Sequence, residues 1–396
     1  MRIGISTSVI QRGRTGIAQY LFALTRALLA HAERHQFVLF VLEEDLELFQ
    51  FARCAMTIIP VPEQYRDPVR DILWHQTVLP RLAREQRLDV LHVPSYRRMV
   101  WRRPCARVAT IHDVAPFRVT GKYDWKRMLY GRVIARRLAR RQERIIAVSR
   151  CTAQDIARYF GVPPGRVTVI HNGVDRERFH PGSRVAAREF ARERYGLERP
   201  FFLYVARLEH PGKNHVRLIS AFNQFRRTTA EPWQLVLAGG DWHGADVIHA
   251  AVRSSPFASE IRTLGFVKDE DLPGLYRAAE AFVYPSLYEG FGMPPTEAMA
   301  CGCPVISSAR GALAEVVGEA AAIVEPESVE SIAEQLLAVA GDAGYRERLS
   351  AAGREQAGRF TWENAAARTL EVYGQAAGEL APEAELGMNV AGKEPV

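Results

Sequence analysis

The sequence predicts an α/β protein built from two Rossmann-like domains, each with a parallel sheet covered by helices. Apolar runs of strand length alternate with helical segments along nearly the whole chain, which is typical of parallel sheets. The length of 396 residues suits two to three domains. Residues 1–180 hold 31 Lys and Arg against 16 Asp and Glu, whereas residues 181–396 hold 21 against 29. We therefore expect two domains with different partners, at 1–180 and 181–361.

The N-terminal half is expected to contain seven strands with helices between them. The predicted strands are Arg2–Ser6, Phe37–Val41, Thr57–Pro60, Val90–His92, Val108–Ile111, Ile145–Val148 and Val167–Ile170. The predicted helices are Thr15–Ala30, Asp67–Glu85, Lys126–Arg144 and a segment between Ser149 and Gly161. In the first of these helices, Leu21, Leu24 and Leu28 recur at helical spacing and predict a buried face.

The C-terminal half begins after a turn at 171–175 and a polar connector that runs to about Pro200. The predicted strands are Phe201–Ala206, Gln234–Ala238, Ile261–Leu264, Ala281–Tyr284, Pro304–Ser307 and Ala321–Val324. Helices are expected at 214–226 and 269–279, and after each of the last two strands. A last long helix is expected at about 362–378, beyond the second sheet. Residues 380–396 are expected to form a disordered tail.

Composition excludes several classes of protein. Hydrophobic residues make up 47% of the chain and charged residues 24%, the balance of a soluble globular protein. The sequence contains no apolar run of about 18 residues, so no transmembrane helix is expected. Residues 1–6 are too short to form the apolar region of a signal peptide. We therefore expect a cytoplasmic protein. The five cysteines form no CxxC pair and no zinc spacing, so they predict no metal site.

The most informative stretch is 284–297, which follows a strand and leads into a short helix with Pro294 in its first turn. A strand, loop and helix in this order present unpaired amides and the positive helix end to an anion. Gly290 and Gly292 let the backbone approach a ligand closely. Glu289 and Glu297 are good acceptors for hydroxyls of a sugar or ribose. The alternative is a turn with two solvated glutamates.

Glu289 and Glu297, spaced E-x7-E around Gly-Phe-Gly-Met-Pro-Pro-Thr, resemble the signature of retaining nucleotide-sugar glycosyltransferases of family 4. The resemblance covers nearly the whole chain and is most specific from 201 to 317. It implies the GT-B fold, in which two Rossmann-like domains face each other across a cleft. It also implies that the C-terminal domain holds the donor, that the N-terminal domain holds the acceptor, and that helix 362–378 packs back on the N-terminal domain.

The resemblance assigns roles to the residues of this loop. Glu297 is expected to accept hydrogen bonds from the nucleotide ribose, and Glu289 from hydroxyls of the transferred sugar. The loop amides from Phe291 to Pro294 are expected to face the diphosphate. The implied substrate-binding residues here are Glu289, Gly290, Phe291, Gly292, Met293, Pro294 and Glu297.

Arg207 and Lys213 come just after strand 201–206, and ligands of doubly wound sheets bind at the carboxyl ends of strands. An arginine offers a fork to phosphate oxygens and a lysine a point charge. Fixed cations favour the departure of a diphosphate, which gathers negative charge as the glycosidic bond breaks. With these cations in place and no Asp-x-Asp motif at a plausible position, we expect no metal cofactor. The alternative is a surface pair of cations.

In the N-terminal domain the resemblance points to Gly16 and His112. Gly16 lies between the first strand and the first helix, where the family places a glycine loop facing donor phosphates and acceptor. His112 follows strand 108–111 and resembles the family's cleft histidine beside the transferred sugar. We predict catalytic roles for His112, Glu289, Arg207 and Lys213. A lone histidine is otherwise more often structural, and a glycine in such a loop is common.

Phe266 and Val267 occur where the family contacts the nucleotide base, and core packing is the alternative for both. The segment 122–144 holds nine Lys and Arg together with aromatic and aliphatic residues. A basic amphipathic helix of this kind suits an anionic membrane surface, and the alternative is a solvated helix face. No nucleic-acid module is present, so we expect no nucleic-acid partner. Docking would place the protein at the inner face of the cytoplasmic membrane.

The expected activity is transfer of a sugar from a nucleotide diphosphate sugar to a hydroxyl of a glycan or lipid-linked acceptor in surface polysaccharide synthesis. The stretch 110–117 looks similar to bacterial mannosyltransferases, so we favour GDP-mannose over a UDP-glucose-type or dTDP-rhamnose donor. Two other readings stay open. One is a nucleotide-sugar epimerase or phosphorylase on the same scaffold, and the other is a non-catalytic nucleotide-sugar binding protein.

Overall fold

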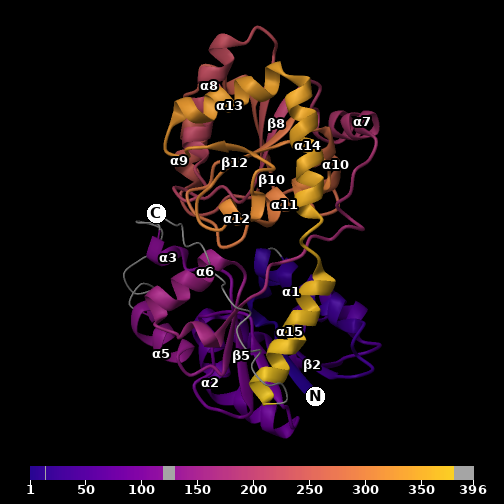
Figure 1. Ribbon diagram of the computed structural model, residues 1–396, viewed down its shortest axis with the longest axis vertical. Coiled ribbons are helices and arrows are strands. Elements are labelled where there is room, and N and C mark those ends of the chain that lie inside the picture. The colour runs from indigo at the N-terminus through magenta and orange to yellow at the C-terminus, as the bar shows by residue number, and fades with distance from the viewer. Residues whose placement is uncertain (14, 119–129, 379–396) are drawn as a thin grey trace, which may run out of the picture.

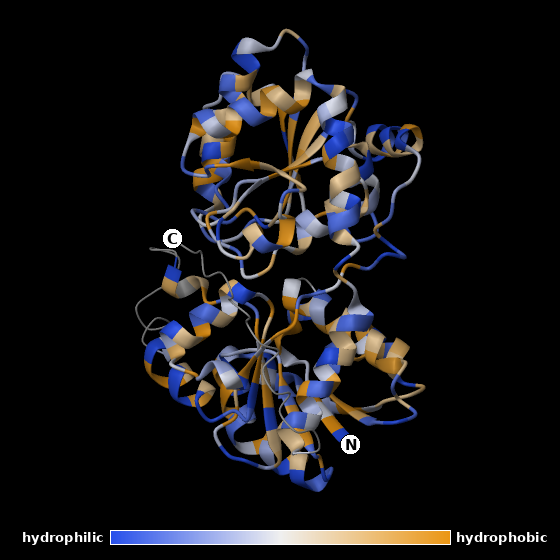
Figure 2. Cartoon of the chain, viewed as in Figure 1, coloured by the Kyte–Doolittle hydropathy of each residue, from blue (hydrophilic) through white to orange (hydrophobic). Residues whose placement is uncertain are grey.

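The computed structural model describes residues 1–13, 15–118 and 130–378, which form two α/β domains stacked along the long axis (Figure 1). The predicted tail at 380–396 and residues 122–129 of the basic segment lie outside the described residues. The predicted fold class is confirmed, because each domain holds one parallel sheet covered by helices. Figure 2 shows apolar residues gathered along the strands of both sheets, as expected for parallel sheets buried on both faces.

The first sheet has the strand order β3-β2-β1-β4-β5-β6-β7. Its strands are β1 (Arg2–Ser6), β2 (Gln36–Leu42), β3 (Thr57–Val61), β4 (Val90–Val93), β5 (Ala106–Ile111), β6 (Arg144–Ala147) and β7 (Val167–Val169). The chain starts at β1, runs outward through β2 and β3, and then returns to the other side of β1 with β4. The order therefore reverses between β1 and β4, where doubly wound sheets bind ligands.

The helices of the first domain cover both faces of this sheet. They are α1 (Gly16–Leu29), α2 (Pro68–Glu85), α3 (Ala115–Arg118), α5 (Arg136–Ala139), α6 (Arg150–Asp155) and α15 (Trp362–Ala377). Shorter helical turns are η1 (Ser8–Gly13), η2 (Glu43–Ala52), η3 (Glu63–Arg66), η4 (Tyr130–Ala135), η5 (Ile156–Phe160) and η6 (Pro164–Arg166). Neighbours on β5 show the two faces, since Val108 packs in the cluster with α1 and α15, and Ala109 in the cluster with Leu138.

The second sheet has the order β10-β9-β8-β11-β12-β13 and reverses between β8 and β11. Its strands are β8 (Phe201–Val205), β9 (Gln234–Ala238), β10 (Ile261–Gly265), β11 (Ala281–Tyr284), β12 (Val305–Ser308) and β13 (Ala322–Val324). Its helices are α7 (Arg184–Tyr195), α8 (His215–Thr228), α9 (Ala245–Arg253), η7 (Ala258–Glu260), α10 (Leu272–Ala278), α11 (Met293–Ala300), α12 (Leu313–Val317), α13 (Val329–Gly341) and α14 (Ala343–Ala357).

Helix α15 comes last in the described chain, yet it packs on the first domain beside α1 (Figure 1). Its buried residues Trp362, Ala366 and Tyr373 belong to the same apolar cluster as Leu21 and Leu24 of α1. The side chain of Thr361 caps the helix by accepting a hydrogen bond from the Asn364 amide. The chain therefore crosses from the second domain back to the first and ends its last described helix there.

Two predictions about local structure were wrong, and one helix was missed. The polar connector expected up to Pro200 contains α7, which the Ser183 side chain caps and Gly196 ends in a left-handed conformation. Helix α9 was not predicted. In the described part of the basic segment, π-type turns cover 130–135, the helix ends at Ala139, and β6 begins at Arg144. The predicted helix up to Arg144 was therefore too long.

Candidate active site

The loops at the carboxyl ends of the two sheets contact one another. Gln19 of α1 donates a hydrogen bond from Nε2 to Oδ2 of Asp269, which follows β10, over 2.6 Å. Thr152 of α6 donates through its hydroxyl to the carbonyl of Gly290, which follows β11, over 3.2 Å. A Cβ built on Gly16 would lie 3.2 Å from Cε of Met293. The strand ends that bind ligands in such sheets therefore face each other across the domain boundary.

Lys213 and Glu289 meet at the switch point of the second sheet, one after β8 and the other after β11. Nζ of Lys213 lies 2.7 Å from Oε1 of Glu289, and the two side chains are 16% and 14% exposed. The same carboxylate oxygen accepts from the Tyr284 hydroxyl over 3.0 Å and the Ser286 hydroxyl over 2.6 Å. The carboxylate is thus fixed by one cation and two hydroxyls, while the ammonium also donates to Tyr284 over 3.2 Å.

The backbone brings this pair together. The carbonyl of Gly212 accepts a hydrogen bond from the Leu287 amide over 3.0 Å and lies 3.2 Å from the Ser286 hydroxyl oxygen. Burial alone would lower the pKa of Lys213, because it disfavours the charged ammonium. The negative charge of Glu289 outweighs burial and raises this pKa, so the ammonium stays protonated. The site therefore holds a positive charge at neutral pH, placed beside a carboxylate that can accept from hydroxyls.

Glu297 lies one helical turn inside α11. Its Oε2 accepts a hydrogen bond from the buried Tyr276 hydroxyl over 3.1 Å. Burial raises the pKa of Glu297 to about 7, although Arg178 and Tyr276 act in the opposite direction. The carboxyl group of Glu297 therefore changes its charge near neutral pH.

Arg207 follows β8 and is 43% exposed. Its guanidinium lies 4.4 Å from the ring centroid of Trp242 and 3.5 Å from Oε2 of the buried Glu209. Trp242 belongs to the segment after β9. The amide of Leu208 donates a 3.0 Å hydrogen bond to the carbonyl of Gly240 in the same segment. Arg207 therefore lies at the same sheet edge as Lys213, held by an aromatic ring and a carboxylate.

The glycine loop is shaped by contacts with both domains. Gly292 has φ of +117°, and a Cβ there would lie 2.7 Å from Cδ2 of Leu313, so only glycine fits without strain. The Phe291 side chain is buried with Val148, Ala312 and other residues in an apolar cluster between the domains. Its ring therefore packs and does not face a ligand, which leaves its backbone for that role. Pro294 has no N–H, so the predicted amide donors end at Met293.

His112 follows β5 at the edge of the first sheet, next to the glycine loop. Burial lowers the pKa of His112 to about 4, so the imidazole is neutral at physiological pH. Its Nε2 is buried and has no hydrogen-bond partner among the described residues. Such an atom costs free energy unless something else pairs with it, so its position suits a ligand hydroxyl.

The two residues predicted to contact a base have different environments. Val267 is 6% exposed and packs in the core of the second domain, so core packing accounts for its side chain. Phe266 is 62% exposed at the carboxyl end of β10, where Gly265 has φ of +67°. The ring of Phe266 thus presents an apolar surface at the sheet edge that also carries Arg207.

Comparison with known proteins identifies the family. The family model "Glycosyltransferase Family 4" matches residues 14–178, and "Glycosyl transferases group 1" matches residues 187–356. The chain is 30% identical over 392 residues to the O-antigen chain mannosyltransferase B of Escherichia coli, covering 94% of this chain and 99% of that protein. This chain is a family 4 glycosyltransferase.

Other relatives and solved structures agree with this assignment. The glycosyltransferase is 32% identical over 287 residues to the MMP alpha-(1->4)-mannosyltransferase of Mycolicibacterium hassiacum, covering 69% of this chain and 66% of that one. Sucrose-phosphate synthase from Thermosynechococcus elongatus superposes with a TM-score of 0.76 at 21% identity, covering 95% and 98% of the two chains. Anabaena HepE in complex with UDP and glucose gives 0.76 at 18% identity, covering 95% and 100%. The predicted GT-B fold is confirmed.

Sequence reasoning missed several residues that join the two domains of the glycosyltransferase. Glu315 of α12 accepts hydrogen bonds from the amides of Arg150 and Cys151 at the start of α6, each over 3.2 Å. Tyr288 donates to Oδ2 of Asp155 over 2.8 Å. No local pattern marks these residues, because each partner lies more than 130 positions away in sequence. These hydrogen bonds join the two domains near the glycine loop.

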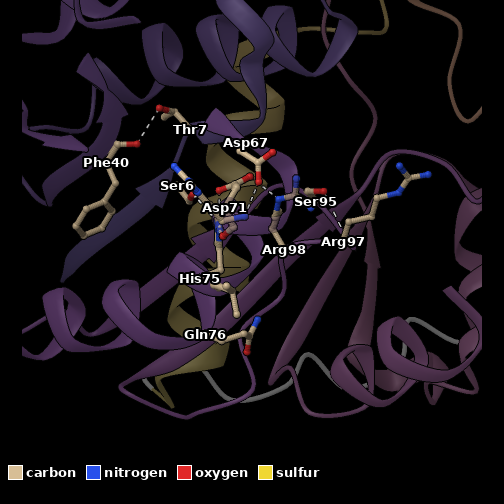
Figure 3. Close-up of polar contacts among 12 residues, drawn as sticks. Ser6, Thr7, Phe40, Asp67, Asp71, His75, Gln76, Ser95, Arg97 and Arg98 are labelled. Atoms are coloured by element: carbon tan, nitrogen blue, oxygen red, sulfur yellow. Dashed lines mark hydrogen bonds and ion pairs between the residues drawn. The ribbon is translucent and has the colours of Figure 1, made fainter. Parts of the chain in front are cut away.

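A second polar cluster lies at the edge of the first sheet (Figure 3). The Ser6 hydroxyl, at the end of β1, is 2.9 Å from Nε2 of His75, and Nδ1 of His75 is 3.1 Å from Oδ1 of Asp71. Asp71 in turn forms an ion pair with Arg98, in the loop after β4. Ser6, His75 and Asp71 are each at most 3% exposed. The cluster supports the switch point of the proposed acceptor domain, and sequence patterns did not reveal it.

No helix in the described part of the chain is long and apolar enough to cross a membrane. Of the basic segment, residues 130–144 are described, and they include the exposed apolar residues Val133 and Ile134. These two side chains stand among arginines at 132, 136 and 137.

Proposed function

We propose that this glycosyltransferase is a retaining mannosyltransferase that moves mannose from GDP-mannose to a hydroxyl of a glycan or lipid-linked acceptor in surface polysaccharide synthesis. The observation that carries the reaction type is the Lys213–Glu289 pair at the switch point of the second sheet, opposite the His112 loop. The choice of mannose rests on the similarity over the full length to the O-antigen chain mannosyltransferase of Escherichia coli.

In this proposal the second domain binds the donor. Arg207 and Lys213 contact the diphosphate, and the amides between Phe291 and Met293 add partial positive charge at the start of α11. These groups stabilise the negative charge that develops on the leaving diphosphate, so no metal cofactor is needed. Glu289 accepts from hydroxyls of the sugar.

Glu297 accepts from the ribose, and Phe266 with the backbone beside Val267 contacts the base. Gly16 lies at the start of α1, where an added Cβ would be 3.2 Å from Cε of Met293, and we assign its backbone to the phosphates and the acceptor.

The first domain binds the acceptor and closes the reacting face. His112 accepts a hydrogen bond from a sugar hydroxyl through its unpaired Nε2. The acceptor hydroxyl attacks the anomeric carbon from the face that the diphosphate leaves. The departing phosphate oxygen takes the hydroxyl proton, so the configuration at the anomeric carbon is retained.

We further propose that the basic segment at 122–144 docks the enzyme on the inner face of the cytoplasmic membrane. Exposed Val133 and Ile134 among arginines support this proposal, since apolar side chains can enter the interface while cations contact anionic lipid. Docking would bring the first domain to a lipid-linked acceptor.

A donor panel with the purified protein tests the activity. GDP-mannose, UDP-glucose and dTDP-rhamnose are each supplied with polyprenyl-linked and alkyl-linked glycan acceptors, and product anomers are assigned by NMR. We expect transfer from GDP-mannose with an α-linked product. An inverted product, or transfer only from another donor, would contradict the proposal in those parts. Turnover of the donor alone into an epimer would indicate an epimerase.

A further inference from the structure

A buried chain of hydrogen bonds connects α15 to the first helix, beneath the loop that carries His112. The Tyr373 hydroxyl lies 2.7 Å from Nδ1 of His92, and Nε2 of His92 lies 2.8 Å from Oγ1 of Thr110. Oγ1 of Thr110 lies 3.1 Å from the Tyr20 hydroxyl. The four residues come from α15, β4, β5 and α1, and none is more than 4% exposed.

The far end of this chain touches the proposed active site. The Tyr20 ring packs edge-to-face with the His112 imidazole, with centroids 4.6 Å apart and planes at 81°. Trp362, in the first turn of α15, contacts the same tyrosine ring at 5.7 Å. Aromatic pairs prefer this T-shaped arrangement, so the Tyr20 ring restricts rotation of the imidazole.

One ring nitrogen of His112 stands out by its surroundings. Nε2 is buried and has no hydrogen-bond partner among the described residues. Burial keeps the imidazole neutral at physiological pH, and a neutral imidazole carries one N–H and one lone pair. When the proton is on Nδ1, Nε2 presents its lone pair and can accept from a ligand hydroxyl.

We propose that Tyr20, Thr110, His92 and Tyr373 are positioning residues that hold His112 with its Nε2 lone pair toward the transferred sugar. The chain lets α15, which arrives from the donor domain, fix a group in the acceptor domain. This inference rests on the proposed function for the role of the sugar, although the orientation of His112 can be measured without it.

Packing alone does not account for a polar chain at this place. Buried hydroxyls and imidazole cost free energy unless all are hydrogen-bonded, whereas Phe and Val at these positions would fill the same space without that cost. Burial lowers the pKa of His92 to about 3, so the chain contains a neutral imidazole that can donate at one nitrogen and accept at the other. A fully satisfied network of this kind specifies one arrangement of its neighbours.

The test uses two hydroxyl deletions, Tyr373→Phe and Tyr20→Phe, in the full chain. Each removes one hydrogen bond and keeps the ring, so we expect kcat to fall about fivefold with the donor KM within about twofold. Tyr195→Phe is the matched control, because it removes a tyrosine hydrogen bond of 2.6 Å to Asp271 in the other domain. The control should keep the wild-type kcat.

A double-mutant cycle separates positioning from general destabilisation. In a His112→Ala background, Tyr373→Phe should have no further effect on kcat, because its route to the reaction is gone. A further fivefold loss in that background would overturn the proposal. Wild-type kcat in both Tyr373→Phe and Tyr20→Phe would also overturn the proposal.

A readout without activity covers the case in which the donor assignment fails. Nitrogen-15 NMR of the histidines should show His112 as the Nδ1–H tautomer in the wild type, and as a mixture of tautomers in Tyr20→Phe. An Nε2–H tautomer in the wild type would overturn the inference whatever sugar is transferred. The expected tautomer together with no mannose transfer would reject the proposed function alone.

Discussion

The carbonyl oxygen of His112 occupies the place that a side chain at Gly290 would need. A Cβ built on Gly290 would lie 1.8 Å from this oxygen and 2.8 Å from Cβ of Asp113. One residue belongs to the first domain and the other to the second, so the two proposed halves of the site approach to backbone contact. This approach is possible only because residue 290 lacks a side chain.

Gly290→Ala should therefore push the domains apart at the reaction centre. Backbone cannot yield as a flexible side chain can, so we expect kcat/KM to fall at least about tenfold while the core of each domain stays folded. Steady-state kinetics and far-UV circular dichroism measure the two effects. Gly165→Ala is the matched control, because nothing lies within 4 Å of a Cβ at that position. Wild-type activity in Gly290→Ala would show that the contact does not matter for transfer.

The Lys213–Glu289 pair can be divided into its structural and catalytic parts. Lys213→Met or Glu289→Gln alone removes one charge of the pair and keeps the other in a largely buried place, which we expect to cost about 3 kcal/mol in the free energy of unfolding. The double variant removes both charges and should regain most of that stability. Activity should stay at least about tenfold low in all three variants if the charges act on the donor.

Urea unfolding and initial rates on the same preparations measure this. A double variant that recovers both stability and activity would mean that the pair only holds the loop. Two singles that are fully stable but inactive would instead mean that water or ligand already replaces the partner.

The sequence predicted the strands well, because parallel strands buried on both faces are continuous apolar runs. All thirteen predicted strands are found among the described residues, with ends within two positions. The glycine loop was located for the same local reason, since strand, glycines, prolines and helix follow one another. Arg207, Lys213, Glu289 and Glu297 do gather at one edge of the second sheet, but their roles remain predictions.

What local patterns could not show is how distant residues meet. In the sequence, Glu315 looks like an ordinary glutamate of a helix. Its partners, the amides at 150 and 151, belong to the other domain, so only the structure reveals them. Phe291 was assigned to the ligand with the rest of its loop, yet its ring fills the apolar cluster between the domains. Helix α7 was missed because its fully buried residues are two alanines, Ala187 and Ala191, and the larger Phe190 and Tyr195 that also pack on the core stand within a highly charged sequence.

Glu297 should make donor binding depend on pH near neutrality. Burial raises the pKa of its carboxyl group to about 7, so the group gains its charge between pH 6 and 8. A carboxylate accepts from ribose hydroxyls more strongly than the neutral acid, so the Kd for the donor should fall as pH rises through 7. Glu297→Gln should flatten this dependence. Calorimetry measures the Kd at each pH. If the Kd of the variant keeps the pH dependence of the wild type, a group other than Glu297 is responsible for it.

The same group predicts a change in stability of known sign. Its folded-state pKa of about 7 lies above the ordinary value of 4.5, so the folded state binds the proton more tightly. The contribution is therefore present below pH 4.5 and is lost as pH rises to about 7. The difference in unfolding free energy between wild type and Glu297→Gln should shift in favour of the variant over this range. A shift of the opposite sign would contradict the raised pKa.

Transfer should not require a divalent cation. In the proposed function, Arg207, Lys213 and the N-terminal amides of α11 supply the positive charge for the leaving diphosphate that a metal ion could otherwise supply. Dialysis against EDTA should leave the initial rate within about twofold, and added Mg²⁺ or Mn²⁺ should not raise it further. A rate that EDTA abolishes and Mg²⁺ restores would show that these groups do not suffice.

Glu315 should stabilise the contact between the two domains at neutral pH and lose this effect in acid. Burial alone would raise its pKa, but hydrogen bonds from His171 and from the amides of Arg150 and Cys151 outweigh burial and lower it. The folded-state pKa thus lies below the unfolded value of 4.5, so the stabilisation is present above pH 4.5 and disappears as pH falls through the folded-state pKa. Glu315→Gln can accept at only one oxygen, so we expect a loss of about 1–2 kcal/mol at pH 7 that becomes smaller as pH falls below 4.5. Urea unfolding at pH 7 and at an acidic pH measures this. Glu85→Gln, in an exposed pair with Arg81, is the control and should change neither midpoint. An equal loss of unfolding free energy at both pH values would mean that Glu315 stabilises the protein by packing and that its charge does not contribute.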